Sequence, residues 1–334
     1  MSALLRELER QLPASRRQRQ ISQISTVAML LVLGLGAGYE AHSRRVCQAA
    51  DRPLAGIWDQ AQRQAAAAAF LRTELPYAET AWRSASARMD AYVRALGDMQ
   101  REACEATFQY RDQSDAVLQA RRLCMEERAA ELRSLADLFT RADQTVVQEA
   151  AQAAAAGLGD LRACSAARVM ARGPLAEDEG PRVHELRLAL AQVTAQLEAG
   201  KTDLALPAAQ RLLKEAEVLG HRGVKAQAEL LIGMAQGLQG NVREAEQSLS
   251  RALWLAEATS DDGIAARAAT ELVLTLWSAQ RDAEAEHQGL HAEALLIRGR
   301  GLDRERARLD ARMVPVLMNR GHLAEALRRA RSAV

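Results

Sequence analysis

The residues of this sequence best suited to covalent chemistry are its four cysteines. They lie far apart along the chain, at Cys47, Cys104, Cys124 and Cys164. No two of them have the CxxC spacing of zinc-binding or redox-active pairs. Widely spaced cysteines are typical of structural disulfides in proteins that fold in oxidising compartments. We therefore predict two disulfide bonds, with four free buried thiols as the alternative.

Two histidines are the next candidates for chemistry. His287 and His291 are one helical turn apart, a spacing that can hold a metal ion. No glutamate stands between them in the position that a metalloprotease needs, and the sequence offers no evident third ligand. It also contains no local signature of a Ser/His/Asp or Cys/His catalytic site. We therefore predict no metal site, no cofactor and no catalytic residue, and we interpret both histidines as surface residues of a helix.

Two tryptophans could serve recognition instead of chemistry. Trp254 and Trp277 lie in the C-terminal half of the chain, and Trp is enriched at the hot spots of protein interfaces. Two interpretations stay open for them, which are packing in a core and anchoring of a ligand in a binding groove. Trp58 and Trp82 are expected to pack in a core.

Helices must position all of these side chains. Hydrophobic residues make up 49% of the chain, but only 3% of it is aromatic, so the apolar content is mostly Ala and Leu. Both are strong helix formers, and Gly (20) and Pro (7) are few. No segment shows the period-two alternation of a β-strand. The sequence predicts an all-α fold.

The charges are almost balanced, which restricts the choice of partners. The chain has 44 basic and 43 acidic residues, for a net charge of +1. This balance gives no overall attraction to nucleic acid. Both signs are interspersed along the expected helices, as on solvated helix faces. We therefore expect no nucleic-acid partner.

An apolar segment near the N-terminus is the clearest change in composition. Residues 21–39 contain no charged residue, and about 20 apolar residues span a bilayer as a helix. We predict a transmembrane helix over residues 21–40, with a cleaved signal peptide or a buried core helix as alternatives. The basic segment 1–20 before it favours a cytoplasmic N-terminus. The protein would then be a single-pass inner-membrane protein whose bulk lies outside the cytoplasm, in the periplasm.

Residues 41–170 contain all the cysteines and are predicted to form a helical region. Helix breakers and capping residues divide it into four helices, over about residues 53–72, 76–108, 114–140 and 143–156. An antiparallel fold-back of the first two helices would bring Cys47 opposite Cys104. The same arrangement of the last two would bring Cys124 toward Cys164. Among the three connectivities that four cysteines allow, we predict these two pairs.

A self-similar region over residues 183–334 follows a linker at residues 171–182 that is rich in Gly, Pro and acidic residues. Small or polar turn residues recur about every 40 positions, and an alanine follows each of them by five positions. Further small residues recur later in each unit. The residues that define the repeat are Gly200, Ala205, Gly233, Gly240, Ala245, Ala252, Gln280, Ala285, Ala292, Gly321 and Ala326, with Leu212 and Ala333 at the positions of Ala252 and Ala292.

This pattern predicts stacked helical hairpins. Glycine tolerates the left-handed conformation at a helix C-terminus, and alanine lets the following helix approach closely. One hairpin cannot bury its apolar face alone, so neighbouring hairpins stack into a solenoid. We expect about four hairpins. The last one is incomplete, so we expect the sequence to be a fragment or to end abnormally.

The units resemble the tetratricopeptide repeat, in which a small residue of the first helix, a turn glycine and two alanines of the second helix recur. Gly233, Gly240, Ala245 and Ala252 stand at these positions in the second unit. The period near 40 departs from the usual 34. Gln280 replaces the turn glycine in the third unit, and Pro315 falls inside a first helix.

Several segments of the middle region resemble a second family, the large bacterial serine/threonine protein kinases that carry tetratricopeptide repeats. These segments are CQAA at residues 47–50, LAGIWD at 54–59, MQREACEAT at 99–107, DQS at 112–114 and RRLCM at 121–125. The resemblance implies that a cytoplasmic kinase domain precedes the basic segment, the span, the cysteine-bearing region and the repeats. The Gly-rich loop, the His-Arg-Asp catalytic loop and the Asp-Phe-Gly motif are absent from this sequence.

The sequence therefore predicts a membrane-anchored module for protein–protein interaction. We expect it to be the extracytoplasmic sensor or scaffold part of a serine/threonine kinase signalling protein, with no enzyme activity of its own. Its partner would be a protein or peptide in a groove formed by the first helices of the repeats, and self-association would bring kinase domains together. The alternative is a structural or cytoplasmic repeat scaffold without a signalling role.

Overall fold

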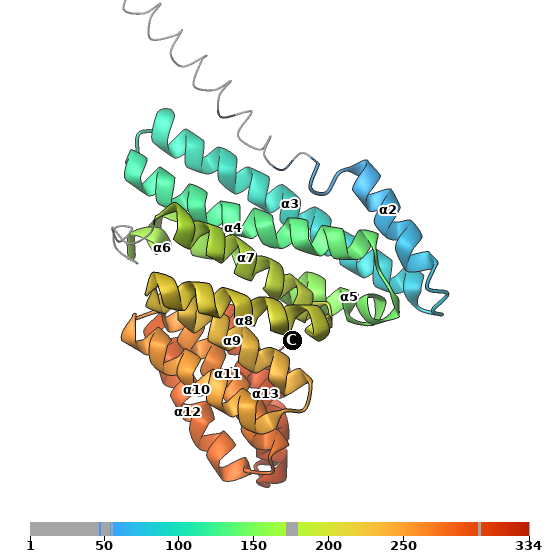
Figure 1. Cartoon of the computed structure of the whole chain (residues 1–334), viewed down its shortest axis with the longest axis vertical. Helices are drawn as coiled ribbons and strands as arrows, with labels where there is room; N and C mark the ends of the chain where they lie inside the picture. The colour runs from blue at the N-terminus through green and yellow to red at the C-terminus, as the bar shows by residue number, and fades with distance from the viewer. Residues whose placement is uncertain (1–46, 48–53, 55, 172–179, 300–301, 334) are drawn as a thin grey trace, which may run out of the picture.

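Figure 1 shows a computed structural model of the chain, which describes residues 47, 54, 56–171, 180–299 and 302–333. Every regular element in these ranges is a helix, which confirms the predicted all-α class. The helices form an N-terminal bundle and a C-terminal series of hairpins. The expected span 21–40, the basic segment 1–20 and most of the linker 171–182 lie outside the described residues. None of the described helices is long and apolar enough to cross a bilayer.

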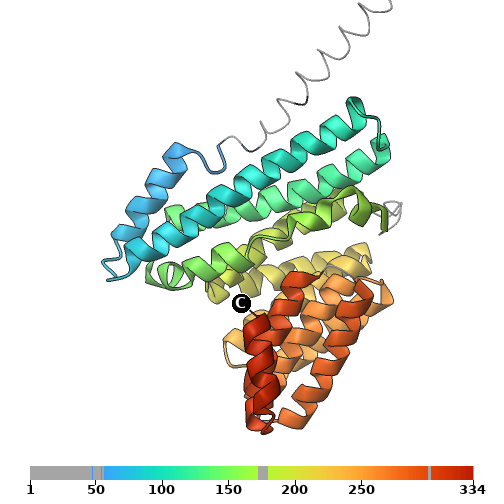
Figure 2. The ribbon, with the colours of Figure 1, turned by 180° about the vertical axis from the view of Figure 1, so that it is seen from behind.

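The bundle is built on two long antiparallel helices, α3 and α4, which lie side by side in Figures 1 and 2. Two shorter helices, α2 and α5, pack against this pair. A short irregular connection with two further turns of helix then leads out of the bundle. In order, these elements are α2 (Gln60–Leu71), α3 (Ala78–Phe108), α4 (Asp115–Thr140), α5 (Gln144–Ala156), the 3-10 helix η2 (Leu161–Cys164) and α6 (Ala166–Ala171).

Capping residues explain where these helices begin. The side chain of Ser114 accepts a hydrogen bond from Val117 N, and that of Asp143 accepts one from Val146 N, close to the predicted starts of α4 and α5. The prediction was wrong for α2, which begins at Gln60 and not near residue 53. Asp59 caps this helix by accepting a hydrogen bond from Gln62 N at 2.9 Å. A turn precedes the cap, so the polar cap and not the earlier proline sets the start.

Aromatic side chains form the centre of the bundle core. The rings of Phe70 and Phe139 meet edge to face with centroids 5.3 Å apart, and Trp82 lies 5.4 Å from Phe70. Trp58 packs between Trp82 and Phe139. Edge-to-face contacts of this kind stabilise a core beyond the area that they bury. Trp58 and Trp82 are thus core residues, as the sequence predicts.

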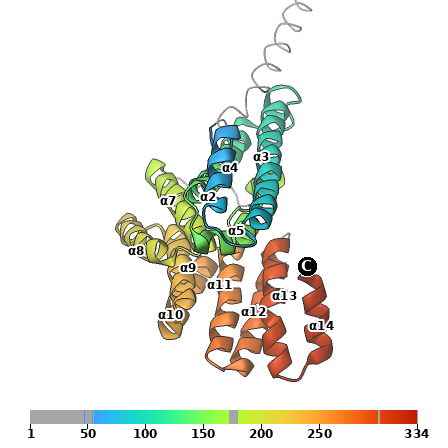
Figure 3. The ribbon, with the colours of Figure 1, turned by 90° about the vertical axis from the view of Figure 1, so that its right-hand side faces the viewer.

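The C-terminal part, which we call the repeat array, consists of four antiparallel helical hairpins. In Figure 3 they follow one another as a curved row from α7 to α14. The hairpins are α7 (Pro181–Glu198) with α8 (Thr202–Leu219), α9 (Arg222–Leu238) with α10 (Val242–Ala258), α11 (Asp262–Ser278) with α12 (Asp282–Gly299), and α13 (Asp303–Asn319) with α14 (Leu323–Ser332). We call α7, α9, α11 and α13 the first helices, and α8, α10, α12 and α14 the second helices.

The turn inside each hairpin has one residue in the left-handed conformation, at the position that the sequence predicts. Gly200, Gly240 and Gly321 have φ of 75°, 80° and 81°, and Gln280 has φ of 61°. Glycine adopts this conformation without the steric cost that a Cβ brings. The turn of the third hairpin thus has the backbone of the others, although its residue is a glutamine.

Small residues let the two helices of each hairpin approach closely. Ala205, Ala245 and Ala285 are completely buried, and Ala326 is almost so. At Gly233, an added Cβ would lie only 2.6 Å from Leu249 Cγ on α10. Ala252 and Ala292 are also buried, whereas Leu212 and Ala333 are only half-buried. In α8 the buried positions are Ala209 and Ala216 instead of Leu212.

Candidate functional site

All four cysteines form disulfides. Cys47 pairs with Cys104 on α3, and Cys124 on α4 pairs with Cys164 in η2. These are the two pairs that the sequence predicts. The first bond ties the start of the bundle to α3. The second ties the connection between α5 and α7 to α4.

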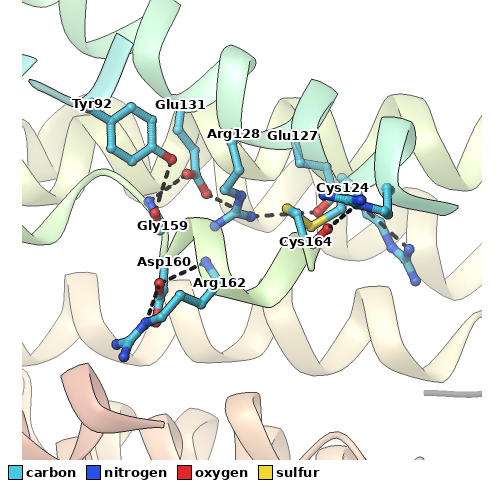
Figure 4. Close-up of a disulfide and its surroundings, with 11 residues drawn as sticks. Tyr92, Cys124, Glu127, Arg128, Glu131, Gly159, Asp160, Arg162 and Cys164 are labelled. Atoms are coloured by element: carbon cyan, nitrogen blue, oxygen red, sulfur yellow. Dashed lines mark hydrogen bonds and ion pairs between the residues drawn. A yellow bond between two sulfur atoms is a disulfide. The ribbon is translucent and has the colours of Figure 1, made fainter. Parts of the chain in front are cut away.

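We call residues 157–171 of this connection the elbow. Figure 4 shows how it lies along α4, with Gly159 and Asp160 below Tyr92 and Glu131. Gly159 N donates to Glu131 Oε2 at 2.8 Å, and Tyr92 Oη donates to Gly159 O at 3.0 Å. A side chain at Gly159 would collide with the guanidinium of Arg128. The elbow therefore follows α4 through hydrogen bonds of the Gly159 backbone, and a larger residue at this position would displace the guanidinium of Arg128.

Buried charges on α4 face the elbow. Arg128 and Glu131 form an ion pair at 3.0 Å on α4. Burial raises the pKa of the Glu131 carboxyl, although Arg128 and the N–H of Gly159 act in the opposite direction. Burial also raises the pKa of the Tyr92 phenol. Tyr92 therefore keeps its proton, which it donates to Gly159 O.

The elbow also contacts the far end of the repeat array. Arg162 Nη1 lies 2.7 Å from Asp303 Oδ2 at the start of α13. Arg168 Nη1 donates to Gly299 O at 3.1 Å, at the end of α12. Arg304 of α13 donates to Leu158 O. The elbow thus bridges α4 of the bundle and the junction between the third and fourth hairpins.

The first hairpin makes a separate contact with the bundle. α7 packs along α4, and His184 Nε2 lies 3.0 Å from Glu126 Oε2 on α4. Lys201, in the turn after α7, pairs with Asp143 at the start of α5. Both ends of the array are therefore held against the bundle, the first hairpin directly and the fourth through the elbow.

The inner face of the array, formed by the first helices, is closed by charged side chains. Arg267 on α11 contacts Glu198 of α7 at 2.8 Å, Glu271 of its own helix at 3.4 Å and Glu305 of α13 at 3.7 Å. Arg308 of α13 also pairs with Glu305, at 2.9 Å. No residue from 224 to 236 of α9, or from 262 to 277 of α11, is exposed. The first helices of the central hairpins therefore do not form the open groove that we expected.

The charge on Arg267 is stabilised by its partners. Burial alone would lower the pKa of Arg267, but Glu305, Glu198 and Glu271 together raise it. Burial and the like charge of Arg267 lower the pKa of Arg308. Arg267 thus remains charged and joins three of the four first helices.

The outer face of the array, formed by the second helices, is where large apolar side chains are exposed. Trp254 on α10 is 65% exposed, Leu290 on α12 59%, and Leu327 on α14 54%. Ion pairs between consecutive hairpins join residues 34 to 36 positions apart. Leu290 follows Trp254 by one such interval, and Leu327 follows Leu290 by nearly another. These three side chains are therefore exposed on the second helices of consecutive hairpins.

The two candidate groove tryptophans do not form a common site. Trp277 is half-buried against the core of the array, and its indole Nε1 is buried without a hydrogen-bond partner among the described residues. Trp254 and Trp277 lie near the C-terminal ends of consecutive antiparallel helices, and hence at opposite ends of these helices. Trp254 is a surface residue, whereas Trp277 packs in the core.

The histidine pair also has a structural role. His291 Nε2 lies 3.0 Å from Glu257 Oε1 on α10, and His287 is exposed on α12. Within the described ranges, no group of three or more His, Cys, Asp or Glu side chains could hold a metal ion. His291 therefore helps to join two second helices.

Comparisons with models of known protein families, with curated proteins and with solved structures found no match for this chain.

Two functional features could not be found by sequence reasoning. The elbow contacts join residues more than 100 positions apart, and no local pattern marks them. The Arg267 cluster draws its carboxylates from three helices of the array. One signal was present for the elbow, because Gly157 and Gly159 interrupt an otherwise helical region.

Proposed function

We propose that this chain is a protein-binding module in which the second helices of the repeat array present the outer face to a protein partner. The observation that carries the proposal is the exposure of Trp254, Leu290 and Leu327 on the second helices of three consecutive hairpins. Large exposed apolar side chains that gather on one face favour protein association, and Trp is prominent among interface hot spots. The closed inner face leaves the outer face as the more accessible surface.

The repeats are proposed to be tetratricopeptide-like. Four hairpins with a left-handed turn residue and buried alanines after it support this assignment. The longer period is accommodated by helices of 17 or 18 residues. The array would thus serve the recognition role that stacked helical hairpins commonly have.

We place the module outside the cytoplasm, anchored by residues 21–40. Two disulfides support an oxidising compartment, and the sequence pattern of residues 1–40 supports the anchor. A sensor role for a serine/threonine kinase remains proposed on the sequence resemblance. A count of free thiols with and without reductant, on membrane and soluble fractions, tests the location. Membrane-bound protein without free thiols is expected, and soluble protein with four reactive thiols would contradict it.

The binding proposal is tested by photo-crosslinking in cells. A benzoylphenylalanine replaces Trp254 on the outer face or Tyr110 at the bundle, two aromatic residues with similar exposure of 65% and 64%. We expect a protein adduct from position 254 and none from position 110. Leu290→Asp should remove the adduct, because it places a charge among the exposed apolar side chains of the outer face. Equal adducts from both positions, or an adduct that survives Leu290→Asp, would contradict the proposed surface.

A scaffold without a signalling role would use the same outer face. The two functions differ in what precedes Met1 in the gene. A kinase coding region in frame with this sequence supports the sensor, and its absence supports the scaffold.

A further inference from the structure

We propose that the Cys124–Cys164 disulfide is a reducible latch that holds the elbow across the inner face of the repeat array. Reduction of this bond would release the elbow from α4 and uncover the first helices. This inference concerns the inner face and does not depend on the binding surface proposed above.

The elbow is placed to cover the Arg267 cluster. An added Cβ at Gly157 would lie 3.3 Å from Cβ of Glu198, one of the carboxylates that pairs with Arg267. Leu158 O accepts a hydrogen bond from Arg304, the residue before Glu305 of the same cluster. The beginning of the elbow therefore contacts the two opposite sides of the cluster, on α7 and on α13.

The disulfide holds the middle of the elbow. Cys164 is completely buried, and its carbonyl oxygen accepts a hydrogen bond from Arg121 Nε at 3.1 Å. Two positions before it, Arg162 pairs with Asp303 of α13, and four positions after it, Arg168 bonds to Gly299 O. The covalent attachment to α4 therefore lies between the two contacts that the elbow makes with the junction of α12 and α13.

The two disulfides differ in their accessibility. Cys47, Cys104 and Cys164 are buried, with exposed fractions of 0%, 3% and 0%, whereas Cys124 is half-buried. Thiol–disulfide exchange requires that a thiolate reach one sulfur of the bond. Cys124 is the only one of the four residues that is partly exposed, so we expect the approach at Cys124 Sγ. A reductant should therefore open Cys124–Cys164 first.

The reductant that we propose is a dithiol. Its thiolate attacks Cys124 Sγ, the Cys124–Cys164 bond breaks, and Cys164 leaves as a thiolate that takes up a proton. The second thiol of the reductant then attacks the mixed disulfide and releases Cys124. Two electrons pass from the dithiol to the protein, which gains two thiols while the reductant becomes a disulfide.

The first experiment titrates the purified full chain with dithiothreitol. Differential alkylation measures which bond opens, and hydrogen–deuterium exchange measures protection of α11 and α13. We expect Cys124–Cys164 to open at lower reductant concentration, with several-fold faster exchange in residues 303–310 and little change in α10. Simultaneous opening of both bonds, or unchanged exchange in α13 after selective opening, would overturn the proposal.

Variants separate the latch from a general loss of stability. The double variant Cys124→Ser with Cys164→Ser should reproduce the faster exchange in α13 without reductant. The matched control, Cys47→Ser with Cys104→Ser, removes the other disulfide and should leave α13 protected. Faster exchange in α13 of both variants would assign the effect to global destabilisation and overturn the latch.

A third variant leaves both disulfides intact. Arg162→Asp sets two like charges against each other at the contact of the elbow with Asp303, and should also speed exchange in α13. The charge swap Arg162→Asp with Asp303→Arg should restore protection. A swap that restores nothing would show that the elbow does not hold α13 through this contact.

Discussion

The bundle packs aromatic rings against one another, whereas the repeat array packs alanine and glycine against neighbouring helices. All three phenylalanines of the chain, all four cysteines and the Trp58–Trp82 pair belong to the bundle. In the array, alanines fill the hairpin interiors, and ion pairs join different hairpins. Large rings and disulfides can fix helices of unequal length such as α2 and α3. Small side chains and repeated ion pairs suit hairpins of nearly equal length, because each hairpin packs on the next one in a similar way.

The largest effect is expected in the aromatic core. Phe139→Ala should destabilise the bundle by about 3–5 kcal/mol, because it removes a fully buried ring and leaves a cavity. Urea unfolding followed by near-ultraviolet circular dichroism measures the loss. The control Leu71→Ala, at a side chain 56% exposed, should change the free energy of unfolding by no more than about 0.5 kcal/mol. Equal losses would show that the rings are not the basis of bundle stability.

A loss of comparable size but different origin is expected in the array. Arg267→Met should cost about 3–5 kcal/mol at neutral pH, because three carboxylates lose a buried partner. Protonation can neutralise these carboxylates, so the folded variant should bind more protons than its unfolded form. Its stability should then fall as pH rises. Urea unfolding at pH 5 and pH 8 should show the larger penalty at pH 8, in contrast to the pH-independent penalty of Phe139→Ala.

Close helix packing in the array is tested by two glycines on α9. Gly233→Ala should destabilise by about 1–3 kcal/mol, because the new Cβ meets Leu249. Gly237→Ala meets only Ala245 Cβ at 3.9 Å, and should stabilise by up to about 1 kcal/mol through its helix propensity. Thermal unfolding of both variants compares them. A stabilising Gly233→Ala would mean that α9 and α10 can separate without cost.

The hairpin turns allow a smaller and reciprocal test. Gln280→Gly should stabilise the array by about 1 kcal/mol, because it relieves a Cβ in the left-handed conformation. Gly240→Gln should destabilise by a similar amount, since its φ is 80° and a side chain there has open space around it. Chemical unfolding measures the change in the free energy of unfolding of each variant. Changes of opposite sign would support equivalent turns. The same sign in both variants would show that the third turn differs from the second.

The contact between the two regions should give the smallest effect. Burial alone would raise the pKa of Asp143, but hydrogen bonds from Lys201 and from Val146 N lower it overall. Asp143 therefore contributes stability above its ordinary pKa, and the contribution is lost as pH falls below about 4. Asp143→Asn keeps the helix cap and should show a shallower loss of stability between pH 5 and pH 3. If stability falls with pH equally in the variant and in the original protein, the Asp143–Lys201 pair does not stabilise the contact between the two regions.

Local sequence patterns were sufficient to predict the helical hairpins, but they were insufficient to predict how the hairpins pack. The turns at Gly200, Gly240 and Gly321 were predicted because a left-handed residue favours glycine wherever it occurs. The cysteine pairs followed from the antiparallel order of adjacent helices. Helix starts were less certain, as α2 shows, because a polar cap competes with an earlier proline.

The candidate site was largely beyond sequence reasoning. Trp254 and Trp277 have the same residue type, and only the packing of α10 and α11 distinguishes the exposed one from the half-buried one. The inner face was expected to be open because first helices line the groove of a solenoid. The structure closes it with Arg267, whose partners on α7 and α13 lie far away in the sequence.

The Cys47–Cys104 bond has a mechanical consequence. It closes a covalent loop with a sequence separation of 57 between the residue that follows the N-terminal segment and a position near the end of α3. Tension applied to the chain before Cys47 would pass through the sulfur atoms directly to Cys104. Residues 48–103, including α2 and most of α3, would carry no load. A pull from the N-terminal side would therefore reach the end of α3 next to α4 while the aromatic core inside the loop stayed intact.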